Sequence, residues 1–181
     1  MFFQDNYYNN QGICRRMALK IKNRHRLKER EVKDLMTDLQ SRFDVVFDIK
    51  AAVDVGTLEE FTVVLVNDSI DFVINQNKVI FTLQGINKYQ PKNKYVVVDM
   101  GAISFITKGA DVMAPGITDA DGGIQVDDLV WICDEKHHKP IALGIALMTG
   151  VDMKSKKIGK AIKTVHYVGD RFWILTHQQG K

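Results

Sequence analysis

The stretch KGADVMAPGI at residues 108–117 decides the fold of this chain. It lies within residues 99–123, a segment that contains five glycines and Pro115. Glycine lets a backbone adopt positive φ angles or approach another backbone closely. We expect Gly109 to open a short helical stretch whose free N–H groups face a phosphate, with Lys108 supplying a cation beside it. The alternative is a tight barrel corner in which the glycines serve geometry alone.

Short apolar runs surround this segment. We expect strands at residues 95–98, 129–133, 140–148, 161–168 and 171–176, and one short helix at residues 101–113. Closely spaced strands separated by Gly, Asp and Lys turns are typical of a small barrel or sandwich. Trp131, Phe172 and Trp173 alternate with apolar neighbours, so we expect them in the barrel core.

The first half of the chain has a different pattern. Apolar residues recur at helical spacing over residues 27–43, which predicts an amphipathic helix. The polar segment 87–94 contains a proline and no apolar period, so it is expected to be a linker. Strands with a hairpin turn at Asn75–Asn77 complete an α+β unit that ends near residue 85. These strands are expected at residues 17–22, 45–50, 60–66, 70–74 and 78–83.

Four strings occur in an order that resembles a PUA domain over residues 95–176. Ile158 departs from the pattern, because it interrupts the usual basic–glycine–basic run. Upstream, the basic strand and helix at 17–43 and the hairpin at 70–83 resemble the pre-PUA domain of a specific group. That group is the archaeal stand-alone PUA proteins related to malignant-T-cell-amplified protein and to the N-terminal part of ligatin. The four strings are KGADVMAPGI (108–117), GGIQVDDLVWI (122–132), KPIALGIALM (139–148) and KKIGKAIKTVHYVGDRFW (156–173).

The resemblance implies an α+β N-terminal domain followed by a small, mostly-β PUA pseudo-barrel. Residues 1–16 are expected to be a disordered extension, residues 17–90 the pre-PUA domain and residues 91–181 the PUA domain. Met17 is a hypothetical natural start.

The resemblance also implies a non-catalytic RNA-binding protein of translation. Its expected partners are structured RNA (tRNA or rRNA), the small ribosomal subunit and a protein resembling density-regulated protein. The alternative is a tRNA-binding accessory module for a transglycosylase or pseudouridine synthase, although no catalytic motif precedes the linker. The implied RNA surface consists of Lys108, Gly109, Ala110, Met113, Pro115, Gly116, Ile117, Lys156, Lys157, Gly159 and Lys160.

The charge of the chain is segregated, although the net charge is only +3. Residues 15–33 hold nine Lys and Arg against two Glu, and residues 152–163 hold five Lys against one Asp. Residues 44–71 hold seven acids against one Lys. Such segregation indicates either an oriented electrostatic surface or ordinary solvated faces. A third class of function, a protein adaptor, would dock through the acidic segment 44–71.

The titratable residues do not predict a catalytic or metal site. Adjacent His137 and His138 would point to opposite faces of a strand, which argues against a joint site. Their surroundings, DEKHHKP, are typical of a hairpin tip. Asp128 matches a structural acid of the PUA family, which weakens a metal site at Asp127 and Asp128. His166 is expected to be a packed or capping residue.

Cysteine usage and hydropathy indicate whether disulfides, metal sites or membrane spans are expected. Cys14 and Cys133 lie in no CxxC pair, so neither a disulfide framework nor a metal site is expected. No apolar run approaches the ~18 residues that span a bilayer. The start of the chain has no secretory pattern. We therefore expect a cytoplasmic protein without a cofactor.

Overall fold

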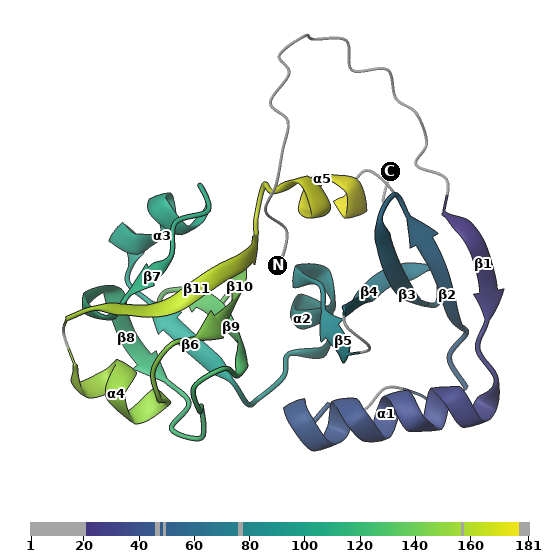
Figure 1. Ribbon diagram of the computed structural model, residues 1–181, viewed down its shortest axis with the longest axis horizontal. Coiled ribbons are helices and arrows are strands. Elements are labelled where there is room, and N and C mark those ends of the chain that lie inside the picture. Colours follow the sequence, from purple (N-terminus) through teal and green to yellow (C-terminus); the bar gives the residue numbers. More distant parts are fainter. Residues whose placement is uncertain (1–20, 46–47, 49, 76–77, 157, 178–181) are drawn as a thin grey trace, which may run out of the picture.

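The computed structural model describes residues 21–45, 48, 50–75, 78–156 and 158–177. Two sheets, each with its own helices, are joined by the segment that follows α2 (Figure 1). The elements are β1 (Lys22–Arg26), α1 (Glu29–Phe43), β2 (Val53–Leu58), β3 (Phe61–Val66), β4 (Ser69–Asn75), β5 (Lys78–Phe81), α2 (Leu83–Tyr89), β6 (Tyr95–Val98), α3 (Met100–Ile106), β7 (Val112–Met113), the 3-10 turn η1 (Ala114–Gly116), β8 (Ile117–Ala120), β9 (Leu129–Asp134), β10 (Pro140–Ala146), α4 (Gly150–Ser155), β11 (Lys160–Tyr167) and α5 (Arg171–His177).

The first sheet is antiparallel throughout, in the order β1-β2-β3-β4-β5. Successive residues of β3 point to opposite faces of the sheet, as the strand period requires. Val64 and Val66 join the core beneath α1, whereas Val63 and Leu65 join a second core on the other face. The amphipathic helix predicted at 27–43 is confirmed as α1, with Leu39 fully buried.

The second sheet has the order β7-β11-β10-β9-β6-β8 and is mostly antiparallel. β6 pairs with β9 in parallel, and the curled sheet encloses its own apolar core, which includes Val98, Ile132 and Ile162. The predicted strands at 95–98, 129–133, 140–148 and 161–168 are confirmed. The α+β part followed by a mostly-β pseudo-barrel is therefore the observed fold class.

Several local predictions in the first half are wrong. No described residue of 45–50 lies in a strand, and β2 forms at Val53–Leu58 instead. The segment 87–94, expected to be a linker, begins inside the helix α2. Thr82 caps the start of this helix by accepting the N–H of Gly85 at 2.9 Å. The expected strand at 17–22 and the turn residues 76–77 lie largely outside the described residues.

The strand predicted at 171–176 is the helix α5. Asp170 caps this helix, since its carboxylate accepts the backbone N–H of Trp173 at 2.7 Å. Phe172 and Trp173 consequently leave the barrel and pack against the first sheet, and Trp131 packs there too. The placement of these three aromatics in the barrel core was wrong.

The two sheets share apolar cores. On β10, Ala142 faces the barrel core, whereas its neighbour Leu143 packs into the core beneath α1. α5 returns to the opposite face of the first sheet, where Phe172 packs with Leu58 and other residues of that core. In Figure 1, α1 and α5 lie on opposite sides of the first sheet.

Leu143→Ala tests whether the two sheets are energetically one unit. The substitution leaves a cavity in the shared core, so the free energy of unfolding should fall by about 2–5 kcal/mol. Urea unfolding, followed by circular dichroism and by tryptophan fluorescence, should still give one transition. The control is Leu147→Ala, because Leu147 is exposed and should change stability little. Two separate transitions would contradict the shared core.

Candidate nucleic-acid interface

β7 and β11 bring the two predicted groups of site residues together. Met113 of β7 is the register partner of Lys160 of β11. The N–H of Ala114 donates to the carbonyl of Gly159 at 2.9 Å, which fixes η1 against the loop before β11. Residues 112–114 and 159–162, far apart in sequence, thus lie side by side at the β7 edge of the second sheet. Lys157 lies outside the described residues.

The expected helix start at Gly109 is wrong. α3 spans Met100–Ile106, so Gly109 follows its C-terminal end, and its N–H donates to the carbonyl of Ile106 at 2.9 Å. Gly109 has a φ of +87°, and a Cβ there would lie 3.0 Å from ring atoms of Tyr167. The glycine is required by geometry, so the phosphate-binding helix terminus proposed for it does not exist.

The side chains of the predicted site differ in exposure. Those of Lys108, Ala110, Met113 and Pro115 are exposed, as are those of Lys156 and Lys160. The side chain of Ile117 is only 1% exposed and belongs to the barrel core. Its expected role at the surface is therefore wrong, whereas Gly116 contributes a carbonyl that accepts the N–H of Asp99 at 2.9 Å.

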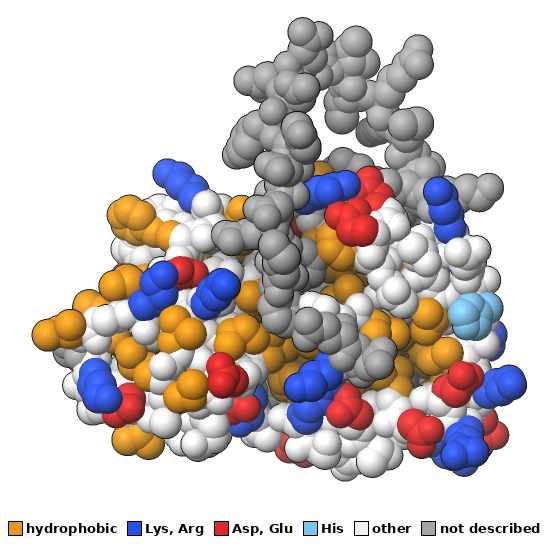
Figure 2. Space-filling view, in the orientation of Figure 1, with side chains coloured by type: hydrophobic (Ala, Val, Ile, Leu, Met, Phe, Trp, Pro, Cys, Tyr) orange, Lys and Arg blue, Asp and Glu red, His pale blue; other side chains and the backbone are white. Residues whose placement is uncertain are grey.

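Two exposed apolar residues on this edge were missed by the sequence analysis. The side chain of Phe105 on α3 is 65% exposed, and that of Ile158 is 85% exposed. In the sequence, Ile158 is visible only as an interruption of the basic run. Phe105 lies in an expected helix, but the sequence does not reveal which face of that helix is exposed. Figure 2 shows hydrophobic and basic side chains together over α3, β7 and the start of β11. We call this the α3–β11 surface; it comprises Phe105, Lys108, Ala110, Met113, Pro115, Lys156, Ile158, Lys160 and Lys163.

Acidic neighbours reduce the positive charge of the α3–β11 surface. The Lys160 amino group lies 2.6 Å from Asp111, and that of Lys156 lies 3.0 Å from Asp152. Lys108 and Lys163 have no ion-pair partner within the described part of the chain. These two lysines are therefore the cations most available to a bound anion.

Comparison with known proteins identifies the two halves of the chain. The PUA domain family matches residues 94–168, and the family described as a domain of unknown function (DUF1947) matches residues 23–89. An uncharacterized protein of Methanocaldococcus jannaschii is 44% identical over 158 residues, which are 86% of this chain and 98% of that protein.

The chain therefore belongs to the family of archaeal proteins in which a pre-PUA domain is followed by a PUA domain.

More distant relatives are eukaryotic. Translation machinery-associated protein 20 of Eremothecium gossypii is 32% identical over 60% of this chain and 63% of its own length. Malignant T-cell-amplified sequence 2 of Mus musculus is 30% identical over 65% of this chain and 67% of its own length. The match thus spans about two thirds of these relatives. The predicted relationship to the malignant-T-cell-amplified group is confirmed.

A solved structure shows the same architecture. A hypothetical protein from Pyrococcus horikoshii is 36% identical, with a TM-score of 0.75 over 84% of this chain and 99% of that chain. A PUA domain protein from Thermoplasma acidophilum, at 24% identity, shares the fold with a TM-score of 0.74.

The histidines of this pre-PUA/PUA protein have structural settings. The exposed His137 and His138 lie in and directly after the β9–β10 turn, where the Asp134 carboxylate accepts the N–H of His137 at 2.6 Å. Burial would raise the pKa of Asp134, but backbone hydrogen bonds from His137, Lys139 and Lys136 lower it overall. His166 is buried, with Nδ1 2.6 Å from the α5-capping Asp170.

Cys133 is not suited to act as a nucleophile. It is buried, and burial raises the pKa of its thiol to about 12, with a further contribution from Asp134. The reactive form of cysteine is the thiolate, which this environment disfavours. Within the described ranges, no cluster of three His, Cys, Asp or Glu side chains could hold a metal ion. No helix among these residues has the length and hydropathy of a membrane span.

The acidic segment 44–71 is largely engaged in internal contacts. Asp54 is buried and pairs with Arg24 and Arg26 of β1. Burial alone would raise the pKa of Asp54, but hydrogen bonds from these arginines lower it. Asp71 is fully buried and accepts hydrogen bonds from the Lys88 amino group at 2.6 Å and the Tyr89 hydroxyl at 2.7 Å. Asp68, Glu59 and Glu60 also pair with arginines, so five of the seven acids in this segment are engaged in ion pairs within the chain.

Gly109→Ala tests the geometric role of this glycine. An alanine would have to adopt a left-handed φ and approach the Tyr167 ring, so the free energy of unfolding should fall by about 1–2 kcal/mol. Gly122→Ala is a matched control, because a Cβ at Gly122 meets nothing within 4 Å. Chemical denaturation of both variants provides the measurement. Equal effects of the two substitutions would show that Gly109 is under no special constraint.

Proposed function

We propose that this protein is a non-catalytic RNA-binding factor of translation that holds structured RNA on the α3–β11 surface. The observation that carries the proposal is the β7–β11 pairing, which places the exposed Met113 beside Lys160. Membership of the PUA family supports RNA binding. The name of the Eremothecium gossypii relative, translation machinery-associated protein 20, supports a role in translation. The ligand that we propose is tRNA or the rRNA of the small ribosomal subunit. Such a role places the protein in the cytoplasm.

The chemistry of the surface suits RNA. RNA is recognised through its shape, its phosphates and its 2′-hydroxyls, and unstacked bases bind to aromatic side chains. Lys108 and Lys163 supply cations without an internal partner among the described residues. Phe105 supplies an exposed ring. The proposed action is binding alone, because the titratable groups described above are buried, paired or dispersed.

Salt dependence provides the first test. Affinities for tRNA, for tRNA without its 3′ end and for isolated small ribosomal subunits are measured across a salt series. Each should weaken as salt rises, because RNA binding releases condensed counterions. Co-sedimentation with the subunit supports the translation role. Tight tRNA binding without it would favour an accessory role in tRNA modification, and the absence of salt-sensitive binding would contradict RNA binding altogether.

Charge reversal provides the second test. Lys108→Glu and Lys163→Glu should each weaken RNA binding and reduce the magnitude of the salt slope by about 1, because each removes a phosphate contact. The combined reversal of Lys156, Lys157 and Lys160 should also weaken it. Lys92→Glu is the matched control, since Lys92 is exposed but lies outside the α3–β11 surface. Unchanged affinity in all surface variants would mean that RNA binds elsewhere.

A further inference from the structure

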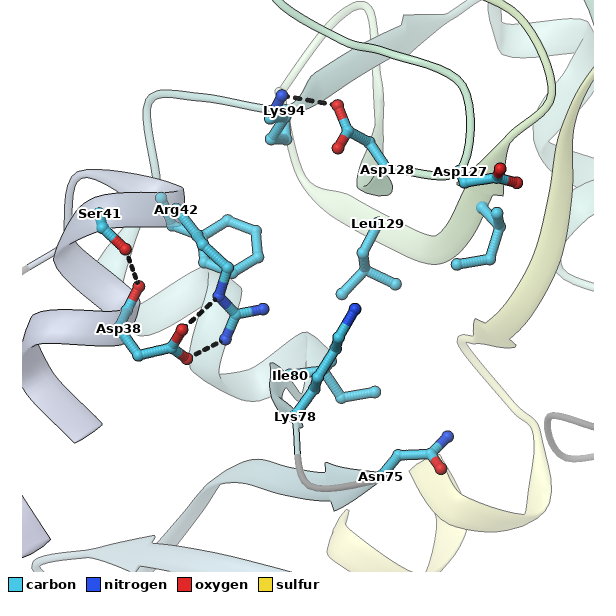
Figure 3. A pocket seen from close by; sticks show the side chains of 12 residues that line it. Asp38, Ser41, Arg42, Asn75, Lys78, Ile80, Lys94, Asp127, Asp128 and Leu129 are labelled. Atoms are coloured by element: carbon cyan, nitrogen blue, oxygen red, sulfur yellow. Dashed lines mark hydrogen bonds and ion pairs between the residues drawn. The ribbon is translucent and has the colours of Figure 1, made fainter. Parts of the chain in front are cut away.

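A cleft of about 700 Å³ lies between the two sheets (Figure 3). Its walls come from the end of α1, the β4–β5 hairpin, the loop before β9, and β10. Ile80, Leu129 and Ile145 provide apolar lining. This volume lies within the ~300–1,000 Å³ typical of ligand sites in proteins.

Charged side chains surround the apolar part of the cleft, and most of them are already paired. Arg42 donates to Asp38 and also to the carbonyl of Val79. Lys94 lies 2.7 Å from Asp128. The Arg42–Asp38 pair lies within α1, and the bond from Arg42 to Val79 joins α1 to β5. The Lys94–Asp128 pair joins the segments that precede β6 and β9.

Three other polar side chains of the cleft have no partner among the described residues. They are the Lys78 amino group, the Asn75 amide and the Asp127 carboxylate. In Figure 3, Lys78 points into the hollow toward Leu129, and Asp127 lies on the other side of Leu129. The backbone of Asp127 is fixed, because its N–H donates to the carbonyl of Ala146 at 2.9 Å. Within the described residues, Lys78 thus presents an unpaired cation to the hollow, and Asp127 places an unpaired carboxylate at the edge beyond Leu129.

The charge balance of the cleft discriminates between classes of ligand. The described residues of the lining include three cations, Arg42, Lys78 and Lys94, and three carboxylates, Asp38, Asp127 and Asp128. A site with no net charge does not favour the polyanionic backbone of RNA. Among the described lining residues the single aromatic is Phe43, which is buried and therefore offers no ring on which a base could stack. A polypeptide, in contrast, can present both charges and an apolar side chain.

We propose that this cleft binds an extended segment of a partner protein that carries an apolar side chain between an acidic and a basic one. The apolar side chain would lie on Ile80, Leu129 and Ile145. The acidic side chain would pair with Lys78 and the basic one with Asp127, and Asn75 would bond to the peptide backbone. The cleft shares no residue with the α3–β11 surface, and its Ile145 lies beside Lys163 on the neighbouring strand β11.

Selection from a phage-displayed library of random short peptides on the immobilised full chain tests the proposal. The enriched peptides should carry an acid and a base around an apolar residue. A synthetic peptide of the enriched sequence should bind Lys78→Glu about tenfold more weakly. Replacing the acid of the peptide with lysine should restore binding to Lys78→Glu. Asp127→Asn, which keeps a residue type tolerant of the left-handed conformation at this position, should weaken binding of the peptide's basic side chain.

The controls separate this proposal from RNA binding. Lys92→Glu should bind the peptide as the unchanged chain does, and both cleft variants should retain their RNA affinity. Failure to enrich any peptide would overturn the proposal, as would equal peptide binding to Lys78→Glu and the unchanged chain. A loss of RNA affinity in Lys78→Glu would assign the cleft to RNA instead.

Discussion

The whole structure depends on β10 being buried on both of its faces. Alternate residues of this strand pack into the barrel core and into the core beneath α1, so the strand belongs to two apolar units at once. Ala142 and Leu143, adjacent in sequence, are both almost fully buried, and they face different cores. Because a strand has only two faces, β10 has none left for solvent. Its position fixes the spacing of the two sheets and therefore the width of the cleft between them.

The α3–β11 surface depends on a local constraint, whereas β10 links the two sheets. The left-handed Gly109 turns the chain away from α3 against Tyr167, and β7 then pairs with β11. The result places exposed apolar and basic residues from two distant segments on one edge. Asp111 and Asp152 partly neutralise Lys160 and Lys156, so the surface combines shape, apolar contact and a moderate positive charge.

The sequence was most informative where the spacing of apolar residues matches the period of only one kind of secondary structure. The helix over residues 27–43 and the four confirmed strands of the second sheet have unambiguous periods, and the order of the four strings identified the family. Short apolar runs were ambiguous: RFWILT at 171–176 fits a strand or a helix, and the Asp170 cap decides for the helix. α2 was missed because its Gly85 resembles a loop signal, yet a Cβ there would lie 2.1 Å from the carbonyl oxygen of Asp71.

The site was harder to predict because exposure and pairing are tertiary properties. Ile117 and Phe105 are both apolar, and only the packing of α3 and β8 determines which one is exposed. Likewise, counting the acids of segment 44–71 could not reveal that Arg24 and Arg26 of β1 pair with Asp54. The cleft was invisible in the sequence, since its residues come from positions between 38 and 145.

The docking of α5 has a consequence for the order of events during synthesis. The first sheet is encoded by residues 22–81, so it leaves the ribosome early. The core between this sheet and α5 includes Phe172 and Leu175, so it cannot close until nearly a hundred further residues have been translated. Throughout that interval the nascent sheet exposes an apolar face that includes Val63, Leu65 and Val73. The docking of α5 is therefore the final step of co-translational folding. Chains that stop before α5 are candidates for chaperone binding.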